Sequence, residues 1–254
     1  MRIWGGEMAN KATITKRNER LLHTKSGNRC AMCKILLVDP NNPSAACIGQ
    51  NAHIYGEKSD AARYDATKDE TFVNSEQNLI FLCCNCHKKI DTDVASYPVD
   101  DLFALKAKHE QWVVEMLKQE SVSYSFAELE VLAKYLMSSV PSTINTPSYS
   151  LLKIDEKIQK NSLQGYQMYI TMGLSSNSTI DDYLNKHPDP LFATQLTNIM
   201  AQKYQELKKQ GLDNDEIFDE LWELASGKQS DFSYKAAGLG ILTYFFEKCE
   251  VFEK

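Results

Sequence analysis

The chain has 254 residues, of which 43% are apolar and 24% charged, which suffices for two modest domains with separate cores and is typical of a globular protein. No apolar run reaches the ~18 residues that a membrane span needs, and the first residues lack the apolar stretch of a secretory signal. We therefore expect a cytoplasmic protein with no membrane partner.

The net charge of −6 is unfavourable for binding nucleic acid, but it is unevenly distributed. Residues 1–120 carry 16 basic and 16 acidic side chains. The net negative charge therefore comes from residues 121–254, which carry 12 basic and 18 acidic side chains. Residues 1–34 hold 8 basic and 2 acidic side chains. This basic arm could contact phosphate groups or be a solvated helix face, and the sequence leaves both interpretations open.

The first predicted elements lie between residues 11 and 33. Apolar residues at helical spacing predict a helix over 11–26, which Gly27 and Asn28 end. The chain then enters the first of two Cys-x-x-Cys pairs. Two such pairs have the spacing that holds one tetrahedral metal ion, and cysteines in the reducing cytosol favour metal over disulfides. We predict a structural zinc ion bound by the thiolates of Cys30, Cys33, Cys83 and Cys86.

Three of the seven cysteines remain outside this set. Cys84 is an alternative ligand to Cys83, but only Cys83 keeps the two-residue spacing to Cys86. Cys47 and Cys249 are predicted to be small buried apolar residues rather than ligands.

The 49 residues between the two pairs exceed the ~15–20 of a simple zinc ribbon, so this segment must carry structure of its own. Two short apolar runs, over 52–55 and 78–82, predict strands, and a helix is expected to begin at the second pair. His53, Asn78 and His87 are therefore expected on a strand, a strand and a helix beside one metal site.

The ordered pattern Cys-x-x-Cys, Ala-His-Ile and Asn-x-x-x-Leu-Cys-x-x-Cys-His resembles the zinc-supported branch of the HNH endonucleases, over roughly residues 20–118. The resemblance implies a treble-clef or ββα-metal module that hydrolyses DNA with Mg²⁺ or Mn²⁺. It implies that His53 is the general base, that Asn78 fixes the strand and loop of His53, and that His87 holds the catalytic ion. Imidazole suits a general base because its pKa is about 6.5.

One position departs from that pattern. Many HNH nucleases carry an acidic residue immediately before the base histidine, and here that residue is Ala52. A hard cation prefers oxygen ligands, so another carboxylate must serve. Asp91 is the first candidate because it lies four residues beyond His87, one helical turn along the same face. Further candidates in the intervening loop are Asp60 and Asp65 as ligands and Arg63 as a phosphate contact.

Beyond the second cysteine pair the chain is predicted to be helical. An amphipathic helix over 101–119 is expected to cover the nuclease module, with His109 as a core residue. Ser125 and Glu128 form a capping box that opens a helix to about residue 139, and Pro and small polar residues over 140–148 predict a linker. Residues from 151 onward have helical spacing and end in a helix that is apolar nearly all round.

We therefore predict an α+β protein. An N-terminal treble-clef or ββα-metal HNH module, held together by the four-cysteine zinc site, covers residues 1–120. A connecting helix and linker cover residues 121–150, and an all-α C-terminal domain covers residues 151–254.

Three segments of the second half resemble the small helical C-terminal domains of effectors in ABC-three component and Lamassu-like antiphage defence systems. They are 157–161, 215–218 and 236–254. The resemblance implies docking onto an SMC-like ABC ATPase and its companion subunit.

The leading hypothesis is thus a DNA endonuclease that acts as the effector of a defence complex. One alternative is a stand-alone restriction-type HNH nuclease, against which the acidic second half argues. The other is a non-catalytic adaptor, held by zinc, that binds DNA or a partner. The adaptor hypothesis gives His53 no role, because four thiolates already complete the coordination of zinc.

Overall fold

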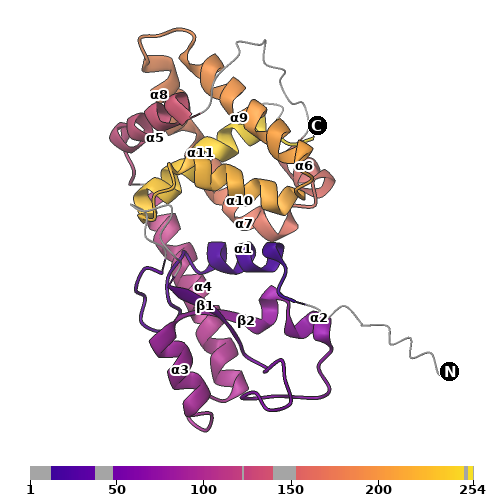
Figure 1. Ribbon diagram of the computed structural model, residues 1–254. Coiled ribbons are helices and arrows are strands. Elements are labelled where there is room, and N and C mark those ends of the chain that lie inside the picture. The colour runs from indigo at the N-terminus through magenta and orange to yellow at the C-terminus, as the bar shows by residue number, and fades with distance from the viewer. Residues whose placement is uncertain (1–12, 38–47, 122, 140–152, 249–250, 254) are drawn as a thin grey trace, which may run out of the picture. The chain divides into compact units, whose positions relative to one another are not determined.

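The computed structural model describes residues 13–37, 48–121, 123–139, 153–248 and 251–253 (Figure 1). Contacts divide the chain into two compact units, the first comprising residues up to 37 with 48–108, and the second comprising residues from 109 onward. The described residues are mostly helical, with one small two-stranded sheet. The predicted linker over 140–148, Cys47 and Cys249 lie outside the described residues, as do residues 1–12 of the basic arm.

The sheet of the first unit joins two segments that lie far apart in the sequence. β1 (Gly49–His53) pairs antiparallel with β2 (Leu79–Cys83), with Ala52 opposite Ile80. All five residues of β2 are buried, whereas β1 buries Ala52 and leaves His53 partly exposed. His53 is therefore the last residue of a strand that has an accessible side.

The helix that precedes the first cysteine pair begins later than its apolar spacing predicted. α1 (Lys16–Lys25) starts after Thr15, whose hydroxyl oxygen accepts a hydrogen bond from the Asn18 amide at 3.1 Å. This side-chain cap satisfies one of the free amides of the first turn and so fixes the start of the helix. The helix ends where Gly27 and Asn28 adopt left-handed φ values of 59° and 56°, as the sequence predicted.

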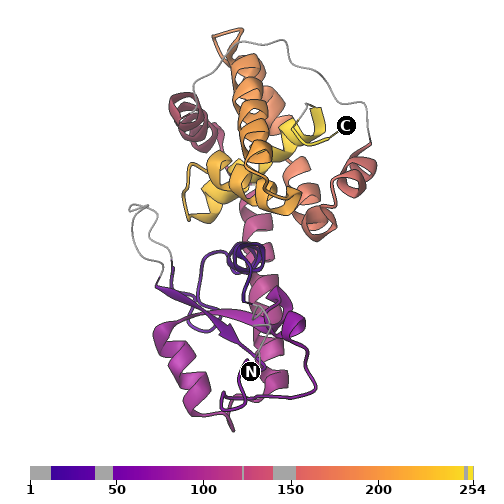
Figure 2. The ribbon, with the colours of Figure 1, turned by 45° about the vertical axis from the view of Figure 1, so that its right-hand side comes forward.

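Two short helices and two longer ones complete this part of the chain. α2 (Glu70–Val73) and η1 (Glu76–Asn78) lie between the strands in sequence, α3 (Cys84–Thr92) begins directly after β2, and α4 (Val99–Ser121) continues into the second unit. α3 lies beside both strands (Figures 1 and 2). The order strand, strand, helix is the predicted one, but β1 spans 49–53 rather than 52–55, and Asn78, which was expected on the second strand, is the last residue of η1, directly before β2.

The core of the first unit is built on β2. Its buried partners come from every neighbouring segment and include Leu22, Leu37, Ile54, Ile90 and Leu102. Burying one such side chain contributes about 1.5–3 kcal/mol. Gly49 lies where a Cβ atom would come within 2.2 Å of the Phe81 ring, so that the ring can pack directly on the backbone of β1.

The second unit is entirely helical in its described residues. Its helices are α5 (Phe126–Ser139), α6 (Ile154–Lys160), η2 (Gln164–Tyr166), α7 (Gln167–Leu174), α8 (Asn177–Lys186), α9 (Phe192–Lys209), α10 (Asn214–Ala225) and α11 (Phe232–Lys248). α11 contacts α5, α7, α8, α9 and α10, which confirms that the helix predicted to be apolar all round is buried. No described helix is both long and apolar enough to cross a bilayer.

α5, which the sequence analysis placed in a connecting segment, packs against four helices of the second unit. Half of its predicted capping box is present: the Glu128 carboxylate accepts from the Ser125 amide at 2.8 Å, while the Ser125 hydroxyl accepts from the Ala127 amide at 3.2 Å. The division between the units falls between Lys108 and His109, inside α4. His109 itself is buried and stacks on Trp112, as expected for a core residue.

The end of the chain is fastened to α6. The Asn161 side chain accepts from the Glu253 amide and donates to the Glu253 carbonyl, both at 3.0 Å. Lys157, which is fully buried, donates to the Phe246 carbonyl at 2.5 Å. Phe252 is 1% exposed and packs on Phe246. These contacts join two of the segments singled out by the C-terminal resemblance, and Phe218 of the third packs on Phe252.

Candidate functional site

The four predicted zinc ligands lie together in the first unit. The sulfur atoms of Cys30, Cys33, Cys83 and Cys86 all lie within 4.8 Å of one another. A tetrahedral site with Zn–S bonds of about 2.3 Å requires sulfurs about 3.8 Å apart. The Cys33 and Cys83 sulfurs are 3.8 Å apart, so the geometry fits a zinc ion. The four-cysteine cluster is confirmed, and zinc remains the metal that the sequence predicts for it.

Local structure explains how the sulfurs are aimed at one point. The Ala31 amide donates to the Phe81 carbonyl at 2.9 Å, which ties the first cysteine pair to β2. At the second pair, Cys83 precedes the first residue of α3, and its sulfur accepts from the Cys86 amide. Cys84 is exposed and does not belong to the cluster, so Cys83, and not Cys84, is the residue that joins Cys86 there.

The thiols of Cys33 and Cys86 resist ionisation in the folded chain, because their pKa values are raised. Burial raises the pKa of the Cys86 thiol, and the neighbouring cysteines raise it further. Burial likewise raises the pKa of Cys33. Four thiolates this close repel one another, so they ionise together only when a cation lies between them. The cluster is therefore suited to a bound metal cation.

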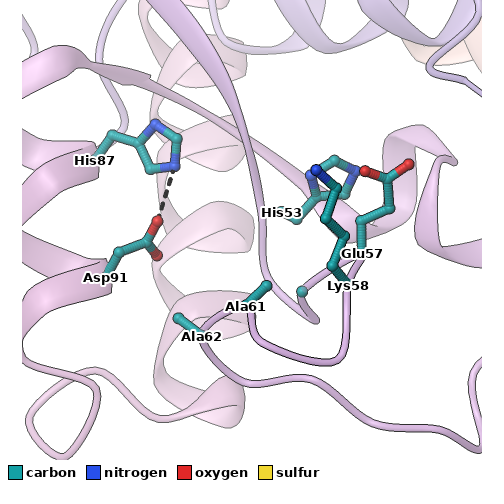
Figure 3. Close-up of a pocket in the computed structure, with 8 residues that line it drawn as sticks. His53, Glu57, Lys58, Ala61, Ala62, His87 and Asp91 are labelled. Carbon is teal, nitrogen blue, oxygen red and sulfur yellow. Dashed lines mark ion pairs between the residues drawn. The ribbon is translucent and has the colours of Figure 1, made fainter.

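A small cavity lies in the same unit, lined in part by the predicted catalytic residues. Its volume is about 170 Å³, and it is lined by His53, Gly56, Glu57, Lys58, Ala61, Ala62, His87 and Asp91. Figure 3 shows His87 and Asp91 on one side, and His53 with Glu57 and Lys58 on the other. The structure thus brings three of the predicted site residues to one cavity, separate from the sulfur cluster.

His87 and Asp91 face each other along α3. The His87 Nε2 atom lies 3.2 Å from an Asp91 carboxylate oxygen, while Nδ1 lies 2.8 Å from the Gln50 side-chain oxygen. Both ring nitrogens therefore face oxygen acceptors, and a proton kept on Nδ1 by Gln50 would leave the Nε2 lone pair for a cation placed between His87 and Asp91. A bare imidazole nitrogen and a carboxylate oxygen are both ligands for a divalent cation. This pair, one helical turn apart, fits the predicted catalytic ion.

The His53 side chain is hydrogen-bonded to Asn74, a residue that the sequence analysis did not identify. The His53 Nε2 atom lies 3.2 Å from the Asn74 side-chain oxygen. The Asn74 amide nitrogen donates to the Glu70 carbonyl at 3.3 Å, which turns its oxygen toward the histidine. The proton of a neutral His53 ring therefore sits on Nε2, and Nδ1 is the basic nitrogen.

Asn78 is buried and makes the contacts expected of a residue that fixes the loop after His53. Its side-chain oxygen accepts from the Tyr55 amide at 2.9 Å, and its nitrogen donates to the carbonyls of Tyr55 at 3.0 Å and Val73 at 2.9 Å. Its own carbonyl accepts from the Ile54 amide at 2.9 Å. Asn78 thus holds the two residues that follow His53 without lining the cavity.

The other loop candidates do not reach the cavity. Asp65 accepts from the amide and hydroxyl of Thr67, at 2.9 and 2.7 Å, and these bonds lower the pKa of its carboxyl group. Neither Asp65 nor Asp60 lines the cavity, so neither can serve as the missing oxygen ligand in this arrangement. Arg63 is not a phosphate contact, because its side chain is only 2% exposed and bonds inside the protein.

Four residues around the cavity were missed by the sequence analysis. Gln50 and Asn74 orient the histidines, but nothing in the sequence distinguishes them from other surface amides, because their contacts come from segments distant in sequence. Glu57 and Lys58 follow His53 closely, and their position in the loop was the only signal available. Charged loop residues are usually solvated, which is why the pair was not singled out.

The second unit contains the residues that match a known protein family. Residues 127–253, half of the chain, match the family described as C-terminal domain 10 of the ABC-three component (ABC-3C) systems. The chain belongs to this family. It is therefore a component of an ABC-3C system, which confirms the resemblance drawn from segments 157–161, 215–218 and the last helix. A search of the curated proteins found no match.

Proposed function

We propose that this protein is a metal-dependent DNA endonuclease and the nuclease subunit of an antiphage ABC-3C complex. The observation that carries the proposal is the shared cavity of His53, His87 and Asp91 beside the four-cysteine cluster. The C-terminal domain supports membership of the complex. The first unit would then supply the chemistry and the second the attachment.

In the proposed reaction His53 removes a proton from water through Nδ1, while Asn74 holds the proton on Nε2. His87 and Asp91 would hold the ion, Mg²⁺ or Mn²⁺, through Nε2 and one carboxylate oxygen. When bound, such an ion stabilises negative charge on the scissile phosphate. Asn78 keeps the His53 loop in place throughout.

Lys58 supplies the remaining requirement, a positive charge beside the base. Its side chain lines the same cavity as His53, on the side away from His87 and Asp91 (Figure 3). A phosphodiester gains negative charge as water attacks, so an ammonium group at this point stabilises the transition state. The cavity of about 170 Å³ is large enough for a phosphate group and too small for a base pair, which suits a nuclease that binds backbone rather than sequence.

The partners proposed for the complex are DNA, an SMC-like ABC ATPase and its companion subunit. The helical C-terminal domain carries the acidic surplus of the chain, with 18 acidic and 12 basic side chains over residues 121–254, which suits a protein partner better than DNA. A stand-alone restriction enzyme would leave the ABC-3C domain without a use. The adaptor hypothesis leaves the His53 cavity without one.

The test is cleavage of supercoiled plasmid by the protein co-purified with its complex, in Mn²⁺ or Mg²⁺. His53→Ala is expected to lower the rate about 100- to 10,000-fold, the usual contribution of a general base. His187→Ala is the matched control, since His187 lies in the second unit and packs on Phe192. Cleavage that survives His53→Ala refutes the mechanism, and absence of cleavage under every condition favours the adaptor.

A further inference from the structure

We infer that Arg63 is a positioning residue that locks the two sides of the proposed site together. Its side chain is 2% exposed, and each of its three guanidinium nitrogens donates a hydrogen bond within the protein. The inference rests on the proposed function, because it concerns the same cavity. It gives a role to a residue that does not itself line that cavity.

The acceptors of Arg63 belong to the two sides of the site. Nε donates to the Ile54 carbonyl at 3.0 Å, immediately after His53. The two terminal nitrogens donate to the Ile90 carbonyl at 2.7 Å and to an Asp91 oxygen at 2.5 Å. One planar group therefore joins the end of β1 to the C-terminal half of α3. The fixed geometry of the guanidinium sets the spacing between them.

The two oxygens of the Asp91 carboxylate have different partners. Oδ1 accepts from Arg63, while Oδ2 lies 3.2 Å from His87 Nε2. The bond at Oδ1 restrains the rotation of the carboxylate, so Oδ2 stays directed toward His87 Nε2, where the proposed ion would sit. Partners of this kind around metal ligands typically change metal affinity by 10- to 100-fold.

The loop that carries Arg63 has a tightly folded backbone. Arg63 has φ of 57°, in the left-handed region that a residue with a long side chain seldom adopts. Its carbonyl accepts from the Gly56 amide, which closes the loop on itself. A Cβ atom at Gly56 would lie 2.5 Å from the Ala62 carbonyl oxygen, so the close approach requires glycine. Because Lys34, Lys228 and Phe252 adopt similar φ values elsewhere, the role of Arg63 is inferred from its hydrogen bonds and not from this conformation.

The test compares Arg63→Lys with Arg29→Lys in the full chain. Arg29 is a matched control, because it lies in the first unit and donates to a backbone carbonyl, that of Lys34, away from the cavity. Mn²⁺ affinity is measured by electron paramagnetic resonance of free Mn²⁺, and folding by zinc content and thermal unfolding. We expect Arg63→Lys to bind Mn²⁺ at least 10-fold more weakly than wild type while retaining its zinc, and Arg29→Lys to bind it normally.

A double-mutant cycle with Asp91→Asn separates positioning from general damage. If Arg63 acts through Asp91, Arg63→Lys should weaken Mn²⁺ binding far less in the Asp91→Asn background than in wild type. Wild-type affinity in Arg63→Lys overturns the inference. If Arg63→Lys and Arg63→Gln both lose their zinc, Arg63 is a structural residue and the inference is also overturned.

The outcomes distinguish this inference from the proposed function. A wild-type protein that binds Mn²⁺ with help from Arg63 but cleaves no DNA refutes the nuclease proposal and leaves the positioning role intact. DNA cleavage together with unchanged Mn²⁺ affinity in Arg63→Lys refutes the positioning role alone. A wild-type protein that binds no Mn²⁺ refutes both.

Discussion

Glu76 is a buried carboxylate whose neutralisation should destabilise the first unit. Its side chain is 7% exposed and forms ion pairs with Lys106 at 2.6 Å and Lys25 at 3.1 Å. Burial opposes its ionisation, but attraction by Lys106 and then Lys25 outweighs burial and lowers the pKa of Glu76. The three residues link η1 to α1 and α4, so they hold together the segments that frame β2.

The loss in free energy of unfolding that we expect for Glu76→Gln depends on how deeply each of its ion pairs is buried. Removing one partner of a buried ion pair costs about 3–5 kcal/mol, because the other charge stays in a poorly solvated place. Lys106 has a side chain 11% exposed and belongs to this class. Lys25 is 26% exposed and adds less than about 1 kcal/mol. We therefore expect a loss of about 3 kcal/mol, a large share of the usual 5–15 kcal/mol of a domain.

Hydrogen exchange measures this loss in the first unit alone. Peptides covering β2 should lose about 100-fold in protection, since about 1.4 kcal/mol corresponds to tenfold. Peptides of α11 serve as the internal reference. Glu76→Gln with Lys106→Met should recover part of the loss, because the second change removes the buried charge. A loss below about 1 kcal/mol, or a double variant no more stable than the single one, would refute the reasoning.

Three further predictions concern acid, metal and the C-terminal core. The pKa of Glu76 is lower in the folded state than in the unfolded state. Its contribution to the free energy of unfolding is therefore complete above the ordinary pKa of about 4.3 and is lost as the pH falls through the folded pKa. Glu76→Gln should thus make the hydrogen-exchange protection of β2 less dependent on acid pH. Cys86→Ser should abolish the binding of the predicted zinc ion, as zinc content per chain would show, and unfold the first unit. Phe252→Ala should lower the free energy of unfolding of the second unit by about 3–5 kcal/mol, and the fluorescence of Trp222 would monitor that unfolding.

The sequence predicted best those features that depend on spacing within one segment. The two cysteine pairs and the His87 and Asp91 pair are local patterns, because a turn or a helix fixes their geometry wherever it packs. The strands around His53 and before Cys83 were predicted for the same reason. The start of α1 was misplaced because apolar spacing was read without the cap at Thr15.

Contacts between distant segments could not be predicted. The position of Arg63 illustrates this, since its bonds reach 9 residues back to Ile54 and 27 and 28 residues on to Ile90 and Asp91. A lone arginine in a charged loop is usually solvated, and only the folded arrangement reveals the acceptors that justify burying it. The same holds for Asn74, whose partner His53 lies 21 residues away.

The absence of an acidic residue before His53 has a structural explanation. Successive residues of a strand point to opposite sides, and Ala52 belongs to the core beside Ile80 while His53 lines the cavity. A carboxylate at position 52 would be buried among apolar side chains, where an unpaired charge is costly. In the proposed site the oxygen ligand therefore has to come from another element, and Asp91 would supply it from α3, where Arg63 bonds to its other oxygen. A small apolar residue at position 52 suits the core, and the proposed ion would then take both of its protein ligands from the helix that carries His87.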